Sequence, residues 1–504
     1  MLHFSKSKYC IFKQCPKASW LQKYKPEVRE ADAAVEARMT KGNEVGDLAM
    51  GLFGDYVEVT SYKADGALDL STMIALTKQY MNEGRDVICE ASFEHNGLYC
   101  AVDLLRKRGN GYAVYEVKSS THPDKYVYLL DVCYQKYVLE KCGVKVDGVY
   151  LVTINNEYVF DGTLDIKQLF TITDVSALVD DEIGMVEGDL KRAEEILSLK
   201  EEPKIDLSCA CSDPYPCAFW NYCSRHLPTP SVFDLYRIKF ERAIELYRKG
   251  TTSFEEVLLS GTKLNDTMKR QIAFALEDKE PYIDQRGVTA FLDTLSFPLC
   301  FLDFETVQPV VPEYVGTRPY QQIPVQYSLH ILKSPDRALE HREFLGRSES
   351  DPRRELAERL IADIPQDACV VAYNKAFECT RIKELAQCFP DLAEQLLKIA
   401  ESIKDLLQPF QKGYYYNRAM GGSFSIKSVL PALFPDDPDL DYHNLEGVHN
   451  GSEAMELFPR LKDMPAQERA IAERNLLKYC ELDTFAMVKV YQELVRVTTE
   501  KKAC

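Results

Sequence analysis

Two carboxylates and one lysine in the segment 102–120 are the residue types that metal-assisted hydrolysis uses. Glu116 and Lys118 are two residues apart in a β-branched and aromatic run, so both side chains point to the same face of a strand. Asp103 lies on the preceding run, and the Gly-Asn-Gly sequence at 109–111 predicts a tight turn between two strands. Two carboxylates beside an ammonium group form a site for Mg²⁺ or Mn²⁺ and a polarised water. An ordinary cross-strand charge pair is the alternative interpretation of these residues alone.

A second pair of acids interrupts the apolar run 297–306, FPLCFLDFET, which predicts a buried strand. Asp303 and Glu305 are two residues apart and share one face of that strand. Like charges side by side repel each other unless a cation lies between them, and an apolar strand has no structural need for them. We therefore expect these two carboxylates to bind a divalent cation.

Two later motifs add acids to this second pair. A predicted strand turns into a helix at Asn374, and Glu378 follows this turn. In a predicted helix over 473–495, Tyr479 and Asp483 are four residues apart, which places them on one helical face. Such a Tyr/Asp spacing is common by chance, and it gains meaning as the third element of an ordered set.

Four cysteines lie close together in the segment 209–223, CACSDPYPCAFWNYC, among proline and aromatic residues. Thiolates gathered in a loop-rich segment are metal ligands in a reducing cell. Structural zinc held by four cysteines is one interpretation of this segment, and an iron–sulfur cluster is the other. The cysteines are Cys209, Cys211, Cys217 and Cys223.

The whole chain limits the class of protein. Its 504 residues favour two to four domains, and 46% hydrophobic with 28% charged residues are typical of a globular protein with real cores. We expect a cytoplasmic protein without a membrane partner, because the sequence has no secretory signal and no run of ~18 apolar residues. A net charge of −17 argues against a protein that coats nucleic acid, although it is compatible with a narrow basic groove. No Walker A pattern is present, so no motor is expected.

Helices are expected to complete the first centre. Apolar spacing over 131–139 predicts a helix that turns Gln135 toward the acids. A helix is also predicted over 31–53, and it contains Glu44. The segment 229–294 has helical period and no identifiable chemistry, so it is predicted to be a helical connector.

The ordered set of Asp103, Glu116-x-Lys118 and Gln135 resembles the core of PD-(D/E)XK nucleases. Within them it is most similar to the RecB-like nucleases that carry an iron–sulfur cluster. The resemblance covers about residues 1–228 and implies that Asp103 and Glu116 bind the catalytic cation. It implies further that Lys118 orients or polarises water and that Gln135 helps to orient DNA or water.

The same resemblance extends to a metal-binding helix and to the cysteines. RecB-like nucleases place an acidic or metal-binding helix near the position of Glu44, although the His that often accompanies it is replaced here by Gly46. In the iron–sulfur branch, three late cysteines join one early cysteine to hold a [4Fe–4S] cluster. The resemblance thus assigns the cluster to Cys15, Cys211, Cys217 and Cys223. Zinc bound with Cys209 in place of Cys15 is the alternative.

The later acids resemble the motifs of DEDD-type 3′–5′ exonucleases of the Tyr subtype, which have a ribonuclease H-like fold. This family has Asp at the position of Glu378, so the sequence departs from the pattern by one methylene. The resemblance implies that the carboxylates hold two ions ~3.5–4 Å apart. It also implies that Tyr479 positions the attacking water. The matching residues are Asp303, Glu305, Glu378, Tyr479 and Asp483.

Together these features predict an α/β protein in three parts. They are a PD-(D/E)XK restriction-endonuclease-like domain with an iron–sulfur clasp over 1–228, a helical connector over 229–294, and a ribonuclease H-like α/β domain over 295–504. The resemblance implies a metal-dependent nuclease for DNA single strands or ends, with a place in DNA repair or phage defence and a helicase or defence-system partner. A nucleic-acid clamp with degenerate centres and an RNA-processing exonuclease are the alternatives.

Two segments mix cations with aromatic rings, which neutralise phosphates and stack on bases. We expect the N-terminal segment to contact nucleic acid, and an amphipathic helix pair with a solvated face is the alternative. Its residues are Lys6, Lys8, Lys13, Lys17, Lys23, Lys25 and Arg29 with Tyr9, Phe12, Trp20 and Tyr24. The second is a predicted contact for the 3′ end, with a surface loop as the alternative. Its residues are Tyr414, Tyr415, Tyr416, Arg418 and Lys427.

Overall fold

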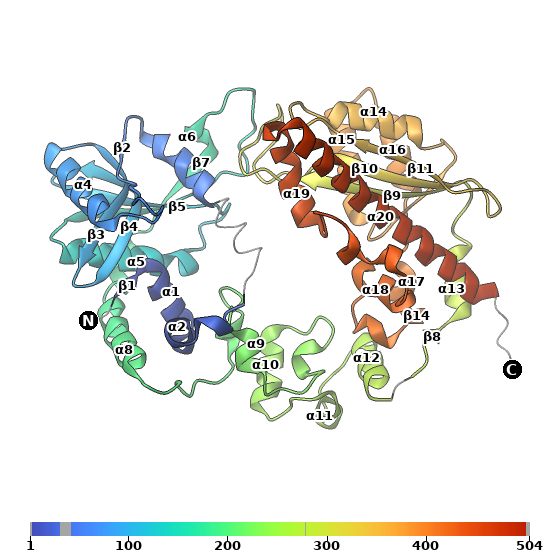
Figure 1. The fold of residues 1–504 in the computed structure, drawn as a ribbon, viewed down its shortest axis with the longest axis horizontal. Helices are drawn as coiled ribbons and strands as arrows, with labels where there is room; N and C mark the ends of the chain where they lie inside the picture. The colour runs from blue at the N-terminus through green and yellow to red at the C-terminus, as the bar shows by residue number, and fades with distance from the viewer. Residues whose placement is uncertain (1–2, 31–41, 278, 500–504) are drawn as a thin grey trace. The chain divides into compact units, whose positions relative to one another are not determined.

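The computed structural model describes residues 3–30, 42–277 and 279–499, and it confirms a mixed α/β protein (Figure 1). The chain divides into two compact units. Unit 1 consists of Met1–Leu227, Phe240–Glu245 and Val310–Tyr320. Unit 2 consists of Pro228–Lys239, Leu246–Pro309 and Gln321–Cys504. The domain boundaries at 228 and 294 stay predictions.

Unit 1 is built on a sheet with the strand order β2-β3-β4-β5-β6-β7, and β1 pairs in parallel with β4 (Figure 1). Its strands are β1 (Phe4–Ser5), β2 (Val57–Glu58), β3 (Val87–His95), β4 (Leu98–Arg108), β5 (Gly111–Lys118), β6 (Val146–Ile154) and β7 (Phe170–Asp174). β5 runs parallel to β6, and helix α5 makes the crossover between them.

The expected hairpin is formed by β4 and β5, which pair antiparallel in the register Leu104↔Tyr115. Gly109 adopts a φ of 57°, a left-handed conformation that glycine reaches without steric cost, and this allows the tight turn. One residue beyond the Leu104–Tyr115 pair, Asp103 and Glu116 come next to each other on the two strands. The hairpin therefore positions both acids of the first centre.

Helices cover both faces of this sheet, since separate cores lie on either side of it. The helices are α1 (Lys6–Gln14), α2 (Pro16–Tyr24), α4 (Leu70–Glu83), α5 (Lys125–Lys141), α6 (Ile166–Leu169), α7 (Ser176–Glu182), α8 (Met185–Ser198) and α9 (Trp220–Ser224). The predicted helix over 131–139 is confirmed within α5. Of the predicted helix over 31–53, the segment 42–49 is helical, and 31–41 lie outside the described residues.

Unit 2 contains a five-stranded sheet in the order β11-β10-β9-β12-β13 and a small sheet of β14 and β8. The strands are β8 (Tyr282–Ile283), β9 (Leu299–Val307), β10 (Ile323–Leu332), β11 (Glu340–Leu345), β12 (Cys369–Ala372), β13 (Lys404–Asp405) and β14 (Tyr415–Tyr416). The central strand β9 is antiparallel to β10 and parallel to β12. The predicted strand over 297–306 corresponds to β9 and is confirmed.

Further helices lie in the segment 229–294, of which Phe240–Glu245 belong to unit 1, and in the part of unit 2 that follows it. They are α10 (Phe240–Arg248), α11 (Phe254–Leu259), α12 (Asp266–Glu277), α13 (Gln285–Leu292), α14 (Arg353–Asp363), α15 (Ala376–Cys388), α16 (Ala393–Ser402), α17 (Gln408–Gln411), α18 (Ile426–Leu433), α19 (Gly451–Arg460) and α20 (Ala466–Thr499). The predicted helix over 473–495 lies within α20 and is confirmed. Within the described ranges, none of the helices has the length and apolar character needed to cross a membrane.

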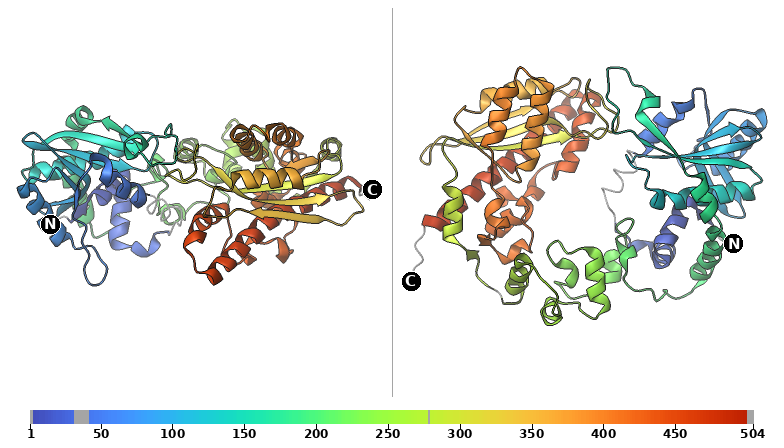
Figure 2. Two further views of the ribbon diagram at one scale, coloured as in Figure 1. Left: turned by 90° about the horizontal axis from the view of Figure 1, so that it is seen from above. Right: turned by 180° about the vertical axis from the view of Figure 1, so that it is seen from behind.

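The five-stranded sheet of unit 2 lies between two helical layers. Cys300, Leu302 and Phe304 of β9 are buried in a core shared with α14, α15 and α16. The alternate residues of β9 face α20, as the ring of Phe301 lies 5.7 Å from that of Tyr491. Figure 1 shows α20 in front of the sheet. The view from behind in Figure 2 shows α14, α15 and α16, in orange, on the opposite face. The face toward α20 is therefore the one that carries Asp303 and Glu305.

Candidate active sites

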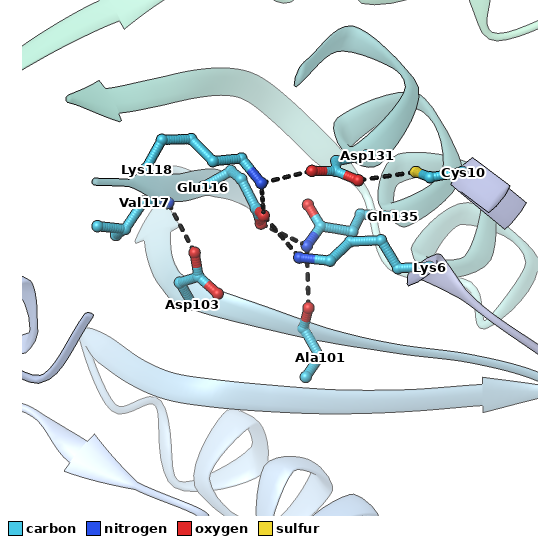
Figure 3. Close-up of polar contacts among 9 residues, drawn as sticks. All are labelled: Lys6, Cys10, Ala101, Asp103, Glu116, Val117, Lys118, Asp131 and Gln135. Carbon is cyan, nitrogen blue, oxygen red and sulfur yellow. Dashed lines mark hydrogen bonds and ion pairs between the residues drawn. The ribbon is translucent and has the colours of Figure 1, made fainter. Parts of the chain in front are cut away.

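The acidic centre of unit 1 is a network of charged and polar groups around Glu116 (Figure 3). Lys118 Nζ and Lys6 Nζ donate to the same oxygen, Glu116 Oε1, at 2.8 and 2.6 Å. Gln135 Nε2 donates to the other oxygen, Glu116 Oε2, at 2.6 Å. The structure thus brings Glu116, Lys118 and Gln135 together from β5 and α5. The remaining Gln135 Oε1 is buried and has no hydrogen-bond partner among the described residues.

Asp103 lies beside this network on β4, where its carboxylate accepts a hydrogen bond from the backbone N of Val117 at 2.6 Å. Burial and repulsion from Glu116 raise the pKa of Asp103 to about 6 from its ordinary value of 3.8. Burial would also raise the pKa of Glu116, but the ammonium groups of Lys118 and Lys6 outweigh it and lower this pKa to about 2. Glu116 is therefore ionised, whereas Lys6 and Lys118 offset only part of the rise in the pKa of Asp103.

Sequence analysis did not find Glu90, a third carboxylate of this centre. Glu90 lies on β3 between Cys89 and Ala91, which pair with β4 on either side of Asp103. Burial and repulsion from Asp103 raise the pKa of Glu90 to about 7. Its φ of 56° is strained for a residue with a side chain, and such strain gathers at functional sites. The sequence does contain a signal for Glu90, because it is an acid inside the otherwise apolar run VICEASF at residues 87–93.

Two further members of the network come from helices. Lys6 begins α1, and its pKa is raised by Glu116, Asp103 and Asp131, although burial alone would lower it. Asp131 of α5 accepts hydrogen bonds from Lys118 and, at 2.9 Å, from the thiol of Cys10. Lys6 was predicted only as part of a basic surface, because nothing local in the sequence connects residue 6 with residue 116.

Two other predicted groups differ from the network in their burial. Glu44 is exposed on the helical segment 42–49, so its role as a metal ligand stays a prediction. The predicted stacking of nucleic acid on the N-terminal aromatic rings is wrong for three of them, because Tyr9, Phe12 and Trp20 are buried in the core of unit 1. The amphipathic alternative therefore describes these rings better.

Four carboxylates from three elements converge on the α20 face of the sheet in unit 2. β9 supplies Asp303 and Glu305, the first turn of α15 supplies Glu378, and α20 supplies Asp483. Because β12 runs parallel to β9 and leads into α15, Glu378 lies near the end of β9 that carries the acids. The structure therefore brings together the four acids that the sequence predicts for this centre.

Electrostatic repulsion within this group is strong. Burial, followed by repulsion from Asp483, Glu305 and Glu378, raises the pKa of Asp303 well above its ordinary value of 3.8. Burial and Asp483 raise the pKa of Glu305 well above 4.5. Burial raises the pKa of Asp483 to about 6 and that of Glu378 to about 8. Buried like charges are unfavourable until a cation lies between them.

Two tyrosines and a lysine border the carboxylates. Tyr442 donates its hydroxyl hydrogen to Asp483 Oδ1 at 2.6 Å, and hydrogen bonds from Tyr442 and Tyr479 offset part of the rise in the pKa of Asp483 that burial causes. Lys427 Nζ lies 5.2 and 5.6 Å from the ring centroids of Tyr442 and Tyr479. No periodic pattern in the sequence marks Tyr442, which begins the short 3-10 helix Tyr442–Asn444.

The second segment of cations and aromatic rings, at residues 414–427, was predicted to contact a 3′ end. The structure places only part of this segment at the second centre. Lys427 lies at the second centre, where its charge offsets part of the rise in the pKa of Glu305. Tyr415 and Tyr416 are buried, and Tyr415 donates its hydroxyl hydrogen to Glu493 at 3.1 Å. The prediction that these two rings contact a 3′ end is therefore wrong, because β14 pairs with β8 and turns them into the core.

The turn before α15 presents Glu378 to the centre. Asn374 adopts a left-handed φ of 67°, and its backbone N donates to Asp405 Oδ1 at 2.9 Å. Glu378 is 2% exposed, and its Oε2 has no hydrogen-bond partner among the described residues. A buried carboxylate oxygen without a donor is costly, and a metal ion would satisfy it.

These raised pKa values predict how the stability of the metal-free protein depends on pH. Between the ordinary values of 3.8 and 4.5 and the raised values of about 6 for Asp483 and about 8 for Glu378, the folded state binds more protons than the unfolded state. The free energy of unfolding should thus fall by a few kcal/mol as pH rises through this window. Thermal unfolding in EDTA at several pH values measures it. Excess Mn²⁺ should remove most of this slope, and an equal slope with and without Mn²⁺ would contradict the assignment.

The four thiols assigned to the cluster act on one another. Burial, followed by Cys15, Cys211 and Cys223, raises the pKa of Cys217 to about 11. Burial also raises the pKa of Cys223, with further contributions from Cys15 and Cys211. Cys209 raises the pKa of Cys211 less than Cys15 does. The early cysteine therefore belongs to the group more closely than Cys209.

Hydrogen bonds hold the early and late parts of this cysteine site together. Gln14 Nε2 donates to the carbonyl oxygens of Ala210 and Tyr215 at 2.8 and 2.7 Å. Lys17 and Glu202 form an ion pair at 2.9 Å. Cys15 caps the start of α2 between these contacts.

Comparison with known proteins gives two matches. Residues 300–425 match a family described as a domain of unknown function (DUF2779). The chain is also 25% identical over 313 residues to Uncharacterized protein UU173 of Ureaplasma parvum serovar 3 (strain ATCC 700970), which covers 55% of this chain and 42% of that protein. The match thus spans less than half the length of this relative. The family segment includes Asp303, Glu305 and Glu378 but ends before α20.

Proposed function

We propose that this protein is a metal-dependent nuclease that hydrolyses phosphodiester bonds of DNA, at single strands or ends, with one centre in each unit. The observation that carries the proposal is the convergence of four carboxylates in unit 2, of which Glu378 and Asp483 are buried and Asp303 and Glu305 are half-buried. Their repulsion raises the pKa of Asp303 well above its usual range, and Glu378 Oε2 has no hydrogen-bond donor among the described residues. Carboxylate oxygens are preferred ligands of Mg²⁺ and Mn²⁺, so the donor set fits these ions.

In unit 2, Asp303, Glu305, Glu378 and Asp483 would hold two divalent ions. Such ions supply an activated water and stabilise the attacking and leaving oxygens. Side chains of the protein position the carboxylates, the attacking water and the phosphate. The hydroxyl of Tyr442 holds Asp483, Tyr479 orients the attacking water, and Lys427 adds positive charge for a phosphate.

In unit 1, Asp103 and Glu116 would hold the ion, and Glu90 adjoins them as a third carboxylate. Lys118 orients or polarises the attacking water, while Lys6 shares Glu116 Oε1 with it. Gln135 fixes Glu116 through Oε2, and its unpartnered Oε1 is free to accept a hydrogen bond from water. These roles follow the resemblance to PD-(D/E)XK nucleases.

We assign a [4Fe–4S] cluster to Cys15, Cys211, Cys217 and Cys223, with Cys209 left over. One zinc ion with ~2.3 Å bonds in tetrahedral geometry would bring its thiolate sulfurs within about 3.8 Å of one another. Among the described residues, the groups of ligand atoms within 4.8 Å of one another contain none of these thiols. The wider spacing supports a larger inorganic core. Such a cluster would close a loop of ~200 residues in unit 1.

The arrangement of the strands supports the finer fold assignments. In unit 2, the strand with both acids is central in a mixed five-stranded sheet with helices on both faces, as expected for a ribonuclease H-like domain. In unit 1, the acids lie on an antiparallel hairpin next to a parallel strand reached through α5, as expected for a restriction-endonuclease-like domain.

A nucleic-acid clamp is the second candidate function, and one observation favours it for unit 1. Glu116 already has two ammonium groups within hydrogen-bond distance, which satisfy part of the charge that a cation would neutralise. If this pairing persists with substrate, the first centre binds DNA without cutting it. The second centre has no comparable pair of lysines in contact with Asp303 among the described residues.

The test uses labelled single-stranded DNA, duplex DNA and RNA with Mn²⁺. Wild type is compared with Glu116→Gln, Asp303→Asn and the double variant. The proposal expects cleavage of DNA by wild type and none by the double variant. Binding without cleavage by wild type would favour the clamp, and preferential cleavage of RNA would favour an RNA-processing exonuclease.

Lys6 provides a separate prediction for the first centre. Lys6→Met should lower the cleavage rate of that centre about 10- to 100-fold, because a group that orients a ligating carboxylate is lost. Since Lys6 lowers the pKa of Glu116, the acid limb of the pH–rate profile should also shift to higher pH. Activity is measured in the Asp303→Asn background, which isolates unit 1. Lys78→Met, at an exposed position of α4 in the same unit, is the control and should change neither quantity.

A further inference from the structure

Two histidines and a glutamate form a separate group of metal-ligand types in unit 2. His330 of β10 and His341 of β11 are direct cross-strand partners, and their ring centroids lie 4.5 Å apart. Glu481 lies on α20, which packs against both strands. One ring nitrogen of each histidine and one carboxylate oxygen of Glu481 all lie within 4.8 Å of one another. None of these residues belongs to the four-carboxylate centre.

A chain of hydrogen bonds orients both imidazole rings. Thr484 Oγ1 lies 3.1 Å from the carbonyl oxygen of Glu481, 2.8 Å from His330 Nδ1 and 2.7 Å from Ser328 Oγ, and Ser328 Oγ lies 2.9 Å from His341 Nε2. When Thr484 donates to the carbonyl, it can accept from His330 and Ser328, and Ser328 can accept from His341. In this arrangement the lone pairs lie on His330 Nε2 and His341 Nδ1. A metal-binding histidine has this arrangement, with its second nitrogen held by a hydrogen bond.

The surroundings suit a cation that arrives from solvent. His330 is 4% exposed, whereas the side chains of His341 and Glu481 are 24% and 47% exposed, and His341 Nδ1 lies 3.7 Å from Glu481 Oε1. Burial, followed by repulsion from His341, lowers the pKa of His330 to about 4, so its ring is neutral at pH 7. Glu343, two residues after His341 on β11, interacts with both His341 and Glu481 and adds negative charge.

We propose that His330, His341 and Glu481 bind one divalent transition-metal ion of the zinc class, with water completing the coordination. Two imidazoles and a carboxylate are a known ligand set for zinc, and imidazole favours zinc or cobalt over Mg²⁺ and Mn²⁺. The ion would join the edge strand β11 to α20 at the helical turn that also carries Tyr479 and Asp483. Its role is to hold this turn in place, and it does not depend on nuclease activity.

The experiment measures zinc bound to the full-length protein without nucleic acid, by equilibrium dialysis. His341→Ala and Glu481→Gln should each bind about one equivalent of Zn²⁺ less than wild type. Zn²⁺ at a hundred-fold excess over its Kd should raise the Tm of wild type by about 5 °C or more, and this rise should shrink in both variants. Co²⁺ in place of Zn²⁺ should give a visible difference spectrum between wild type and His341→Ala.

Controls separate this site from the other metal-binding groups. His95→Ala removes an imidazole of unit 1 and should leave the zinc stoichiometry unchanged. Asp303→Asn should retain the zinc site while it weakens Mn²⁺ binding, so failure of the nuclease proposal would not affect the result. Glu481→Gln changes a half-exposed side chain and keeps the test valid if His341→Ala folds poorly. Equal zinc stoichiometry in wild type, His341→Ala and Glu481→Gln would overturn the proposal.

Discussion

Replacing Asp303 by Asn is expected to reduce the proposed nuclease activity of unit 2 by ~10³-fold or more, because it removes one of the carboxylates that would hold the ions. The same change should stabilise the metal-free protein. Asp483, Glu305 and Glu378 all repel Asp303, and a neutral side chain of the same size ends this repulsion. A rise in Tm of about 2–4 °C in EDTA is the expected size. Activity is measured on 3′-labelled single strands in the Glu116→Gln background.

The loss of activity and the rise in Tm have opposite directions, and this distinguishes a metal ligand from a structural residue. A residue that only supports the fold would lose activity and stability together when replaced. Asp367→Asn is the matched control, because Asp367 is an exposed aspartate just before β12 in the same unit, and it should change neither quantity. A fall in the metal-free Tm of Asp303→Asn, or full activity of this variant, would refute the four-carboxylate metal centre.

Replacing Cys15 by Ser is the second change with a large expected effect. It should remove most of the iron and of the visible absorbance near ~400 nm that thiolate-bound clusters give. It should also lower the Tm of unit 1 substantially, because the proposed cluster would tie α1 and α2 to the segment 209–223 and its binding free energy would contribute to folding. Iron and sulfide analysis, absorbance spectra and calorimetry measure these effects on protein purified without oxygen.

Cys209→Ser is the matched control for this prediction, since Cys209 lies in the same segment but acts on Cys211 more weakly than Cys15 does. It should retain the iron, the absorbance and the Tm. If the site instead binds zinc with Cys209 in place of Cys15, Cys209→Ser should lose the metal and Cys15→Ser should keep it. If Cys209→Ser lost the metal and Cys15→Ser kept it, or if the purified protein held zinc and no iron, the cluster assignment would be wrong.

The sequence predicts the residues of the second centre more completely than those of the first. Asp303 and Glu305 are two residues apart on a strand, and Tyr479 and Asp483 are four apart on a helix, so local periodicity alone predicts which side chains share a face. Lys6 and Glu90 could not be found in this way. Their closeness to Glu116 and Asp103 depends on the packing of α1 and on the pairing of β3 with β4.

The proposed zinc ligands of unit 2 also could not be found from local periodicity. His330 and His341 are eleven positions apart by number, and Glu481 is far along the chain, so no motif joins them. The register of β10 with β11 places the two rings opposite each other, and α20 brings the glutamate above them. A different register by one residue would turn one ring to the other face of the sheet.

By itself, the sequence determined the α/β class, the hairpin of the first centre, the strand and helix of the second, and the acids that these elements carry. Those features depend on side-chain periodicity and turn residues within short segments, which local chemistry dictates. Only the tertiary structure decided that Lys6 joins Glu116, that Tyr442 holds Asp483, that Tyr415 and Tyr416 are core residues, and that residues 310–320 belong to unit 1. These outcomes depend on which distant surfaces bury each other, and short stretches of sequence do not encode such long-range pairing.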